Sequence, residues 1–364
     1  MSRAALVTGF PSLRARHIVR ALLARPEPGE VIVLVPRERV DEARELLARE
    51  ELSARVTLVE ADPTAIDFGL SGPRYLELAH RVQVVHAAYS ITDTPAPERL
   101  AEAVNIGQTR ELIEFARAAS SLRALVLYSS VFVSGQRTGV VSEAELEAGQ
   151  SFRGPVERTL ATAERMLRDS HVPRIVLRAG HLLGDSQRGV VEHLSGPYWL
   201  IAFIASAPAD AALPVLPGAD APLCVTPVDH LARFGVFAGE RAAAGSTFHV
   251  IDPTRLGLRQ FLAEVAERCG RRLEPGFHPS SLTRLLAGNP ALKALPQHVR
   301  GVLEVLTSGA EYASDGATDL VSHGAPECPP FATYLDRLLD HVRERIERGE
   351  LFTTRRQTPA FLVA

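Results

Sequence analysis

The sequence predicts an α/β fold with a doubly wound parallel sheet, and three features of the chain support this class. Short runs of apolar, β-branched residues alternate with helical patterns from the N-terminus to about residue 180. These runs are apolar throughout, which is typical of strands that helices cover on both faces. The connections are short and helical, so right-handed crossovers are expected.

Strands are expected in the first half of the chain at 4–9, 30–36, 54–62, 82–88, 124–130 and 174–180. Helices are expected between them at 14–25, 39–50, 73–80, 98–119 and 154–169. Repeated strand–helix units of this kind predict a Rossmann-like nucleotide-binding core over residues 1–184.

The regular alternation ends near Gly184. Proline, glycine and alanine dominate residues 206–222, and the later segments are mostly helical in pattern. We therefore expect residues 185–348 to form a smaller, mostly helical substrate or lid module, from which segments such as 224–252 return to the core. Residues 349–364 are expected to form a tail.

The composition excludes several classes of function. The formal net charge is −3 at pH 7, which offers no electrostatic basis for binding nucleic acid or an anionic membrane. An uninterrupted run of about 18 apolar residues does not occur, so no membrane span is expected, and the N-terminal apolar run is too short for a signal peptide. The three cysteines are isolated, which predicts no metal site and a reducing, cytoplasmic compartment.

The stretch VTGFPSLRARHIV (7–19) joins the first strand to the first helix, where the pyrophosphate of a dinucleotide meets a helix N-terminus. Here the chain resembles the extended short-chain dehydrogenase/reductase family, most closely its thioester and fatty-acyl reductase branch, whose motif reads T-G-x-x-G-x-x-G. Thr8 and Gly9 match this motif, while Ser12 and Ala15 replace its later glycines. A serine Cβ at position 12 obstructs the approach of backbone to phosphate.

The resemblance continues in register to about residue 265. Arg37 lies where NADP-preferring relatives often carry a basic residue, although a solvated arginine in an arginine-rich chain is an equal alternative. Asp62 corresponds to the adenine-contacting acid, and Ala87 and Ala88 to the turn beneath the cofactor. The resemblance thus implies NADP or NAD as cofactor, bound by Thr8, Gly9, Ser12, Ala15, Arg37, Asp62, Ala87, Ala88 and Asn105.

The family's Y-x-x-x-K pair is missing. The tyrosine of that pair exchanges a proton with the substrate oxygen, and the lysine one turn later lowers its pKa. In GPVERTLATAERMLRD (154–169), the two positions fall on Val156 and Leu160. Lys293 is the only lysine of the chain, so no shift of the alignment restores the pair.

Other groups are candidates for proton transfer. Ser130 takes the position of the family's active-site Ser/Thr, and Tyr89 and His181 follow predicted strands. For Tyr89, an ordinary loop aromatic is favoured over a catalytic phenol. His181 and Asp185 fit a packing or capping role equally well, and the spacing of these residues does not predict a nucleophilic triad.

Three functions remain open on the sequence. The first is NAD(P)-linked reduction of a hydrophobic carbonyl or acyl-type small molecule by a non-standard active site. The second is non-redox rearrangement, cyclisation or dehydration on the same fold, and the third is a catalytically inactive Rossmann-fold binding protein. The resemblance also implies a homodimer formed through two core helices, of which 154–169 is one.

Overall fold

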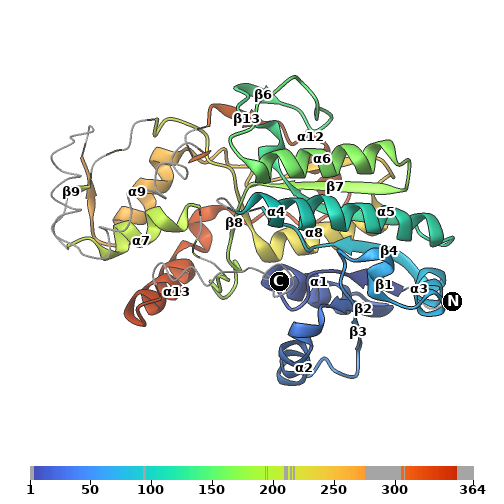
Figure 1. The fold of residues 1–364 in the computed structure, drawn as a ribbon. Helices are drawn as coiled ribbons and strands as arrows, with labels where there is room; N and C mark the ends of the chain where they lie inside the picture. Colours follow the sequence, from blue (N-terminus) through green and yellow to red (C-terminus); the bar gives the residue numbers. More distant parts are fainter. Residues whose placement is uncertain are drawn as a thin grey trace.

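The computed structural model of the chain describes residues 4–92, 96–192, 194, 196–208, 212–213, 215, 218–274, 305–306 and 308–350. Its centre is a seven-stranded, fully parallel sheet with helices on both faces (Figure 1). The strands, from one edge to the other, are β11 (Thr247–Val250), β7 (Arg174–Ala179), β5 (Ala124–Ser130), β4 (Val82–Ala87), β1 (Ala4–Val7), β2 (Glu30–Val35) and β3 (Val56–Glu60). This order is doubly wound, with its reversal between β1 and β4, so the predicted fold class is confirmed.

Each face of the sheet has its own apolar layer. Helices α1 (Leu13–Leu23), α2 (Val40–Arg49) and α8 (Val228–Arg241) pack on one face. The other face is covered by α3 (Gly72–Arg81), α5 (Gln108–Ala118) and α6 (Pro155–Asp169). Because both faces are covered, the central strands are buried along their whole length, as in β5.

The helix expected at 98–119 is interrupted. The structure has α4 (Glu98–Ala101), a π-helical turn (Glu102–Gly107) and then α5. A π turn shifts the side chains that follow it by about one position relative to a continuous α-helix. This turn contains Asn105, whose amide is held by groups outside the helix.

The chain after β7 builds a second apolar cluster. Helices α7 (Tyr198–Ser206), α9 (Leu258–Arg268) and α13 (Leu335–Glu347) pack together, beside one end of the sheet (Figure 1). Three short parallel pairs accompany them: β8 (His181–Leu183) with β10 (Val225–Pro227), β9 (Ala212–Leu213) with β12 (Arg272–Leu273), and β6 (Gly139–Val141) with β13 (Ala310–Tyr312). Helix α12 (Asp315–Ser322) packs against β11 at the edge of the sheet.

The boundaries at residues 184 and 348 stay predictions. Lys293 and the predicted tail beyond residue 350 lie outside the described residues. Across the described ranges, every helix is too short or too polar to cross a bilayer.

A buried ion pair joins the sheet to α6. Arg178 in β7 and Glu164 in α6 are each 2% exposed, and Arg178 donates from Nε and Nη2 to the Glu164 carboxylate at 3.0 and 2.8 Å. Ser129 in β5 also donates to Glu164. Arg178 donates from Nη1 to the Glu145 carbonyl at 2.8 Å, so both charges are satisfied where water is excluded.

Arg178→Met is expected to lower the free energy of unfolding by about 3–5 kcal/mol, because it leaves the Glu164 carboxylate buried without its counter-charge. Chemical denaturation measures this change. The double variant Arg178→Met/Glu164→Leu should recover most of the loss. Arg168→Met, at an exposed pair with Glu147, is the control and should cost about 1 kcal/mol or less. A loss at Arg168 equal to that at Arg178 would contradict the assignment.

Candidate functional site

The loop after β1 is shaped by one required glycine. Gly9 has φ +82°, and a Cβ on it would lie 2.9 Å from the backbone nitrogen of Tyr89. The Tyr89 N–H in turn donates to the Thr8 hydroxyl at 3.1 Å. The matched T-G of the motif therefore seats the loop after β1 against the loop after β4, at the reversal point of the sheet where this fold binds its ligands.

The N-terminus of α1 is already satisfied by protein groups. Ser12 is the N-cap, and its hydroxyl accepts from the Ala15 N–H at 3.4 Å. The Leu13 N–H, the first of the helix, donates to the Glu192 carboxylate at 2.9 Å. Two of the N–H groups that would face a pyrophosphate are thus bonded within the chain. Ala15 is fully buried, which agrees with close packing at the third glycine position.

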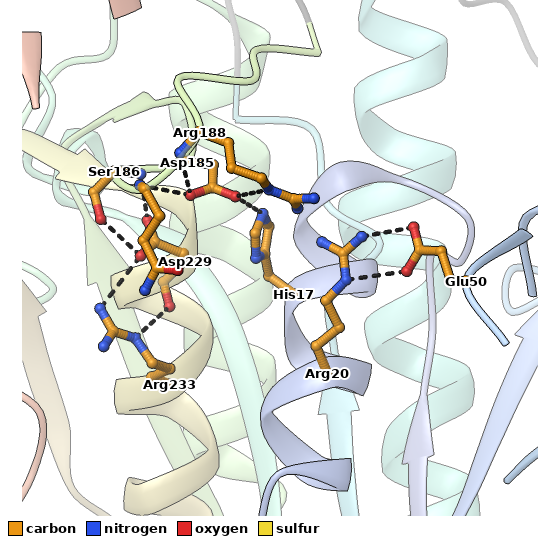
Figure 2. A network of polar contacts seen from close by, with 9 residues as sticks. His17, Arg20, Glu50, Asp185, Ser186, Arg188, Asp229 and Arg233 are labelled. Carbon is orange, nitrogen blue, oxygen red and sulfur yellow. Dashed lines mark hydrogen bonds and ion pairs between the residues drawn. The ribbon is translucent and has the colours of Figure 1, made fainter. Parts of the chain in front are cut away.

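The loop of residues 185–192, which ends in Glu192, is held on several sides, and Figure 2 shows the contacts of its residues Asp185, Ser186 and Arg188. Asp185 begins the loop, and its carboxylate lies 3.5 Å from His17 Nε2 in α1 and 3.1 Å from Arg188. Ser186 donates to Asp229 in α8 through both its N–H and its hydroxyl at 2.8 Å. The loop therefore joins α1 to α8, and Asp185 acts within it as a structural ligand of backbone N–H groups.

The positions implied for an adenosine half lie at the carboxyl ends of their strands. The Arg37 side chain is 89% exposed after β2, at 3.8 Å from Glu60. Asp62 follows β3 and accepts from the Thr64 N–H and hydroxyl at 2.8 and 2.7 Å. Ala87 and Ala88, at the end of β4, are buried.

Tyr89 faces the same half of the site. Burial raises the pKa of its phenol to about 12, and the Asp62 and Glu38 carboxylates contribute further. Its carbonyl accepts from the Gln108 amide at 2.5 Å. The phenol therefore stays protonated at neutral pH, and its catalytic role stays a prediction.

Asn105 makes hydrogen bonds to two other segments of the site. Its Oδ1 accepts from the Ile91 N–H at 2.9 Å, and its Nδ2 donates to the Ile91 carbonyl and to Thr159 at 3.1 and 3.0 Å. The residue is 2% exposed. In this chain the family asparagine joins the loop after β4 to Thr159 of α6. Thr159 lies between Val156 and Leu160 in the sequence.

Val156 and Leu160 are core residues. They are 1% and 2% exposed and belong to a small apolar cluster that also contains Ala101, Val133, Leu146 and Ala161. Neither side chain can exchange a proton, and the cluster provides no polar atom in their place. The family's acid and its tuning amine are thus replaced by packing.

Ser130 ends β5, and His181 begins β8, two residues after the end of the neighbouring strand β7. Ser130 is paired with Ala179 across β5 and β7, and its hydroxyl donates to the Ala179 carbonyl at 3.3 Å. Ser130 as a whole residue is 2% exposed. The His181 ring packs against the Phe132 ring in a tilted arrangement with a centroid distance of 4.7 Å, and burial lowers the pKa of His181 to about 3. His181 is therefore neutral at physiological pH.

The residues present fit an adenosine half better than the rest of a dinucleotide. Arg37 and Asp62 lie after β2 and β3, and their contacts with a cofactor stay predictions, while the Glu192 carboxylate accepts from the first N–H of α1. In the part of the chain that the structure describes, no three His, Cys, Asp or Glu side chains are grouped to hold a metal ion.

The family described as male sterility protein, an NAD-binding domain, matches residues 7–234. The chain belongs to this family. The predicted membership of the extended short-chain dehydrogenases/reductases is confirmed, with the altered glycine motif and the missing Tyr and Lys described above. The male sterility family is a family of NAD-binding domains.

Solved structures of similar fold include reductase domains. The terminal R domain from the myxalamid PKS-NRPS biosynthetic pathway is 20% identical with a TM-score of 0.77, covering 96% of this chain and 92% of that one. The reductase domain of a non-ribosomal peptide synthetase from Mycobacterium tuberculosis is 21% identical with a TM-score of 0.69, covering 94% and 92%. At these identities the likeness shows the fold.

One curated relative is the non-reducing polyketide synthase tazA of Aspergillus terreus (strain NIH 2624 / FGSC A1156). It is 27% identical over an alignment of 299 residues, and the match covers 72% of this chain and 11% of that protein. The chain thus spans about a tenth of the length of this relative.

The sequence did not reveal Glu192. It lies in an irregular loop, 179 residues from Leu13, and belongs to no motif. Ser12, in place of a motif glycine, was the one indication in the sequence of such an internal contact. A serine at the N-cap indicates that the chain itself bonds the N–H groups of the helix N-terminus.

Acidification is expected to lower stability through buried histidines. Burial lowers the pKa of His86 and His181 to about 3 and of His17, His230 and His249 to about 4, from 6.5. The unfolded chain then binds more protons than the native one below 6.5, so this contribution is complete above 6.5 and is lost as pH falls toward 4.

Urea denaturation from about pH 7 to about pH 5 should show this fall in the free energy of unfolding. His86→Asn keeps an acceptor for the Tyr128 hydroxyl, which lies 3.1 Å from His86 Nδ1, but cannot titrate. It should flatten the pH dependence, whereas exposed His80→Asn should leave it unchanged. Equal slopes in all three proteins would refute the explanation.

Proposed function

We propose that this chain is a divergent member of the male sterility family that acts on a hydrophobic carbonyl or acyl-type small molecule by non-redox chemistry, such as cyclisation, rearrangement or dehydration. The observation that carries the proposal is the burial of Val156 and Leu160 in an apolar cluster. A family reductase needs a proton donor at the first position and a cationic amine at the second. Both functions are absent there.

The proposed substrate class has two supports. The resemblance to thioester and fatty-acyl reductases favours an acyl-type substrate, and the solved structures of similar fold include domains of PKS and NRPS systems. The helical cluster around α7 adds apolar surface beside the carboxyl edge, with the half-buried Trp199 and Phe203 packed against it.

Ser130 and His181 are the proposed polar groups of the reaction. The Ser130 hydroxyl would donate to the substrate oxygen in place of the Ala179 carbonyl. His181 would take part as a neutral imidazole, because burial disfavours its cation. Together they suit a reaction in which bonds form and break within the substrate without gain of a hydride.

NAD(P)-linked reduction by a non-standard site is the second candidate. It is supported by the presence of Arg37, Asp62 and Asn105, the residues to which the resemblance assigns cofactor contacts. In that case the substrate oxygen would be stabilised by Ser130 or water. A binding protein without turnover is the remaining alternative.

Product analysis separates these functions. The full chain, incubated with 3-hydroxyoctanoyl and 3,5-dioxooctanoyl thioesters of N-acetylcysteamine and with deuterated NADPH, should give the enoyl thioester and water or the cyclised pyranone and free thiol, without deuterium and with no loss of NADPH. Mass spectrometry and absorbance measure the two quantities. Deuterium in an aldehyde or alcohol would establish reduction instead, and thioester binding without any product would favour the binding protein.

Ser130→Ala should lower the turnover number by about a hundredfold with little change in KM, because one donor to the developing oxyanion is lost. Ser134→Ala is the matched control on the turn that follows β5. Its hydroxyl bonds Tyr312 at 2.8 Å, so turnover should change little. Unaltered turnover in Ser130→Ala would remove Ser130 from the mechanism.

The homodimer also stays a proposal. The outer face of α6 carries Arg158, Arg165 and Arg168, which pair with Glu98, Glu102 and Glu147 of the same chain. A dimer through this face would bury charged rather than apolar groups. Light scattering of the full chain measures the oligomeric state directly.

A further inference from the structure

The contact between Glu192 and α1 has the geometry of an anion on a helix N-terminus. The Glu192 carboxylate accepts from the Leu13 N–H at 2.9 Å, and Leu13 is the first residue of the helix. Helix N-termini bind carboxylates and phosphates through the same unpaired N–H groups and the same partial positive charge. The protein therefore supplies its own anion at the loop after β1.

Arg16, in the first turn of α1, adds positive charge close to Glu192. Arg16 lies close enough to Glu192 for the carboxylate to oppose the effect of burial, which lowers the pKa of the guanidinium. Its Nε is buried and has no hydrogen-bond partner within the described part of the chain. An anion at the N-terminus of α1 is thus stabilised by Arg16 as well as by the helix. Without Glu192, Arg16 and the Leu13 N–H would be available to a different anion.

The loop that delivers Glu192 is built to hold it there. Asp185 N–H donates to the Val190 carbonyl at 3.0 Å and Gly189 N–H to the Asp185 carbonyl at 2.7 Å, which closes the loop on itself. Gly189 has φ +69°, and a Cβ there would lie 2.0 Å from the Arg337 carbonyl of α13.

Helix α13 also holds the loop by its side chains. Arg345 donates to the Glu192 carbonyl and Arg337 to the Ser186 carbonyl, each at 3.3 Å. The carboxylate is thus placed by the C-terminal helical cluster, and not by a flexible arm.

We propose that Glu192 is an internal substitute for the cofactor phosphate, which makes it the residue that decides whether a dinucleotide can bind to this chain. A phosphate and the carboxylate cannot share the Leu13 N–H, and two anions in one place repel each other. NAD or NADP would bind only if the loop of residues 185–192 were displaced from α1. The contacts of this loop with α8 and α13 oppose that displacement. The inference does not depend on the proposed non-redox chemistry, since it concerns binding without substrate.

Calorimetric titration of the full chain tests this with ADP, NADPH and adenosine as probes. Glu192→Ala should bind ADP and NADPH at least about tenfold more tightly than the unaltered chain, because the competing charge is gone. Glu192→Gln keeps an acceptor for the Leu13 N–H without the charge, and should show a smaller gain. Adenosine has no phosphate, so its affinity should stay the same in all variants.

Glu267→Ala removes an equal charge from an exposed position in α9 and is the matched control. Circular dichroism shows whether each variant is folded, and Glu192→Gln serves if Glu192→Ala is not. Equal ADP affinity in the unaltered chain and in folded Glu192 variants, including no binding in any of them, would overturn the proposal. So would an equal gain for adenosine, which would show general opening of the site.

Discussion

The covering of the parallel sheet on both faces is the constraint on which the rest of the structure depends. Strands such as β5 are buried along their length, so their side chains can only be apolar or internally paired. Arg178 meets this condition through Glu164, at 2% exposure for each. Polar side chains that could contact a ligand are therefore confined to the carboxyl edge of the sheet. Asp62, Tyr89 and Ser130 lie there, beside the loop that contains Gly9.

That edge also has to satisfy the first N–H groups of α1. In a dinucleotide-binding protein the phosphate completes them, so glycines keep the approach open. In this chain Ser12 and Glu192 complete them instead. At the altered glycine motif and at the positions of the missing Tyr and Lys, this chain has internal contacts where the family pattern has groups that meet cofactor or substrate.

The sequence predicted the sheet well and the site only in part. The strands could be found because continuous apolar runs have few other uses, and β5 at Ala124–Ser130 was expected at those residues. The π turn at Asn105 could not be predicted, since the helix-forming residues of this segment do not distinguish a π turn from a continuous α-helix. The loss of the pair at Val156 and Leu160 followed from residue identity alone. Glu192 could not be found, because its partner is fixed by the closure of the whole chain.

The distance along the chain between Leu13 and Glu192 has a consequence for biosynthesis. Residues made first tend to fold first, and contacts across 179 positions close late. The sheet up to β7 can form while the helical cluster that holds the Glu192 loop has yet to be made. A nascent chain would thus present the start of α1 to cellular anions, and synthesis of its last helix would withdraw that surface from them.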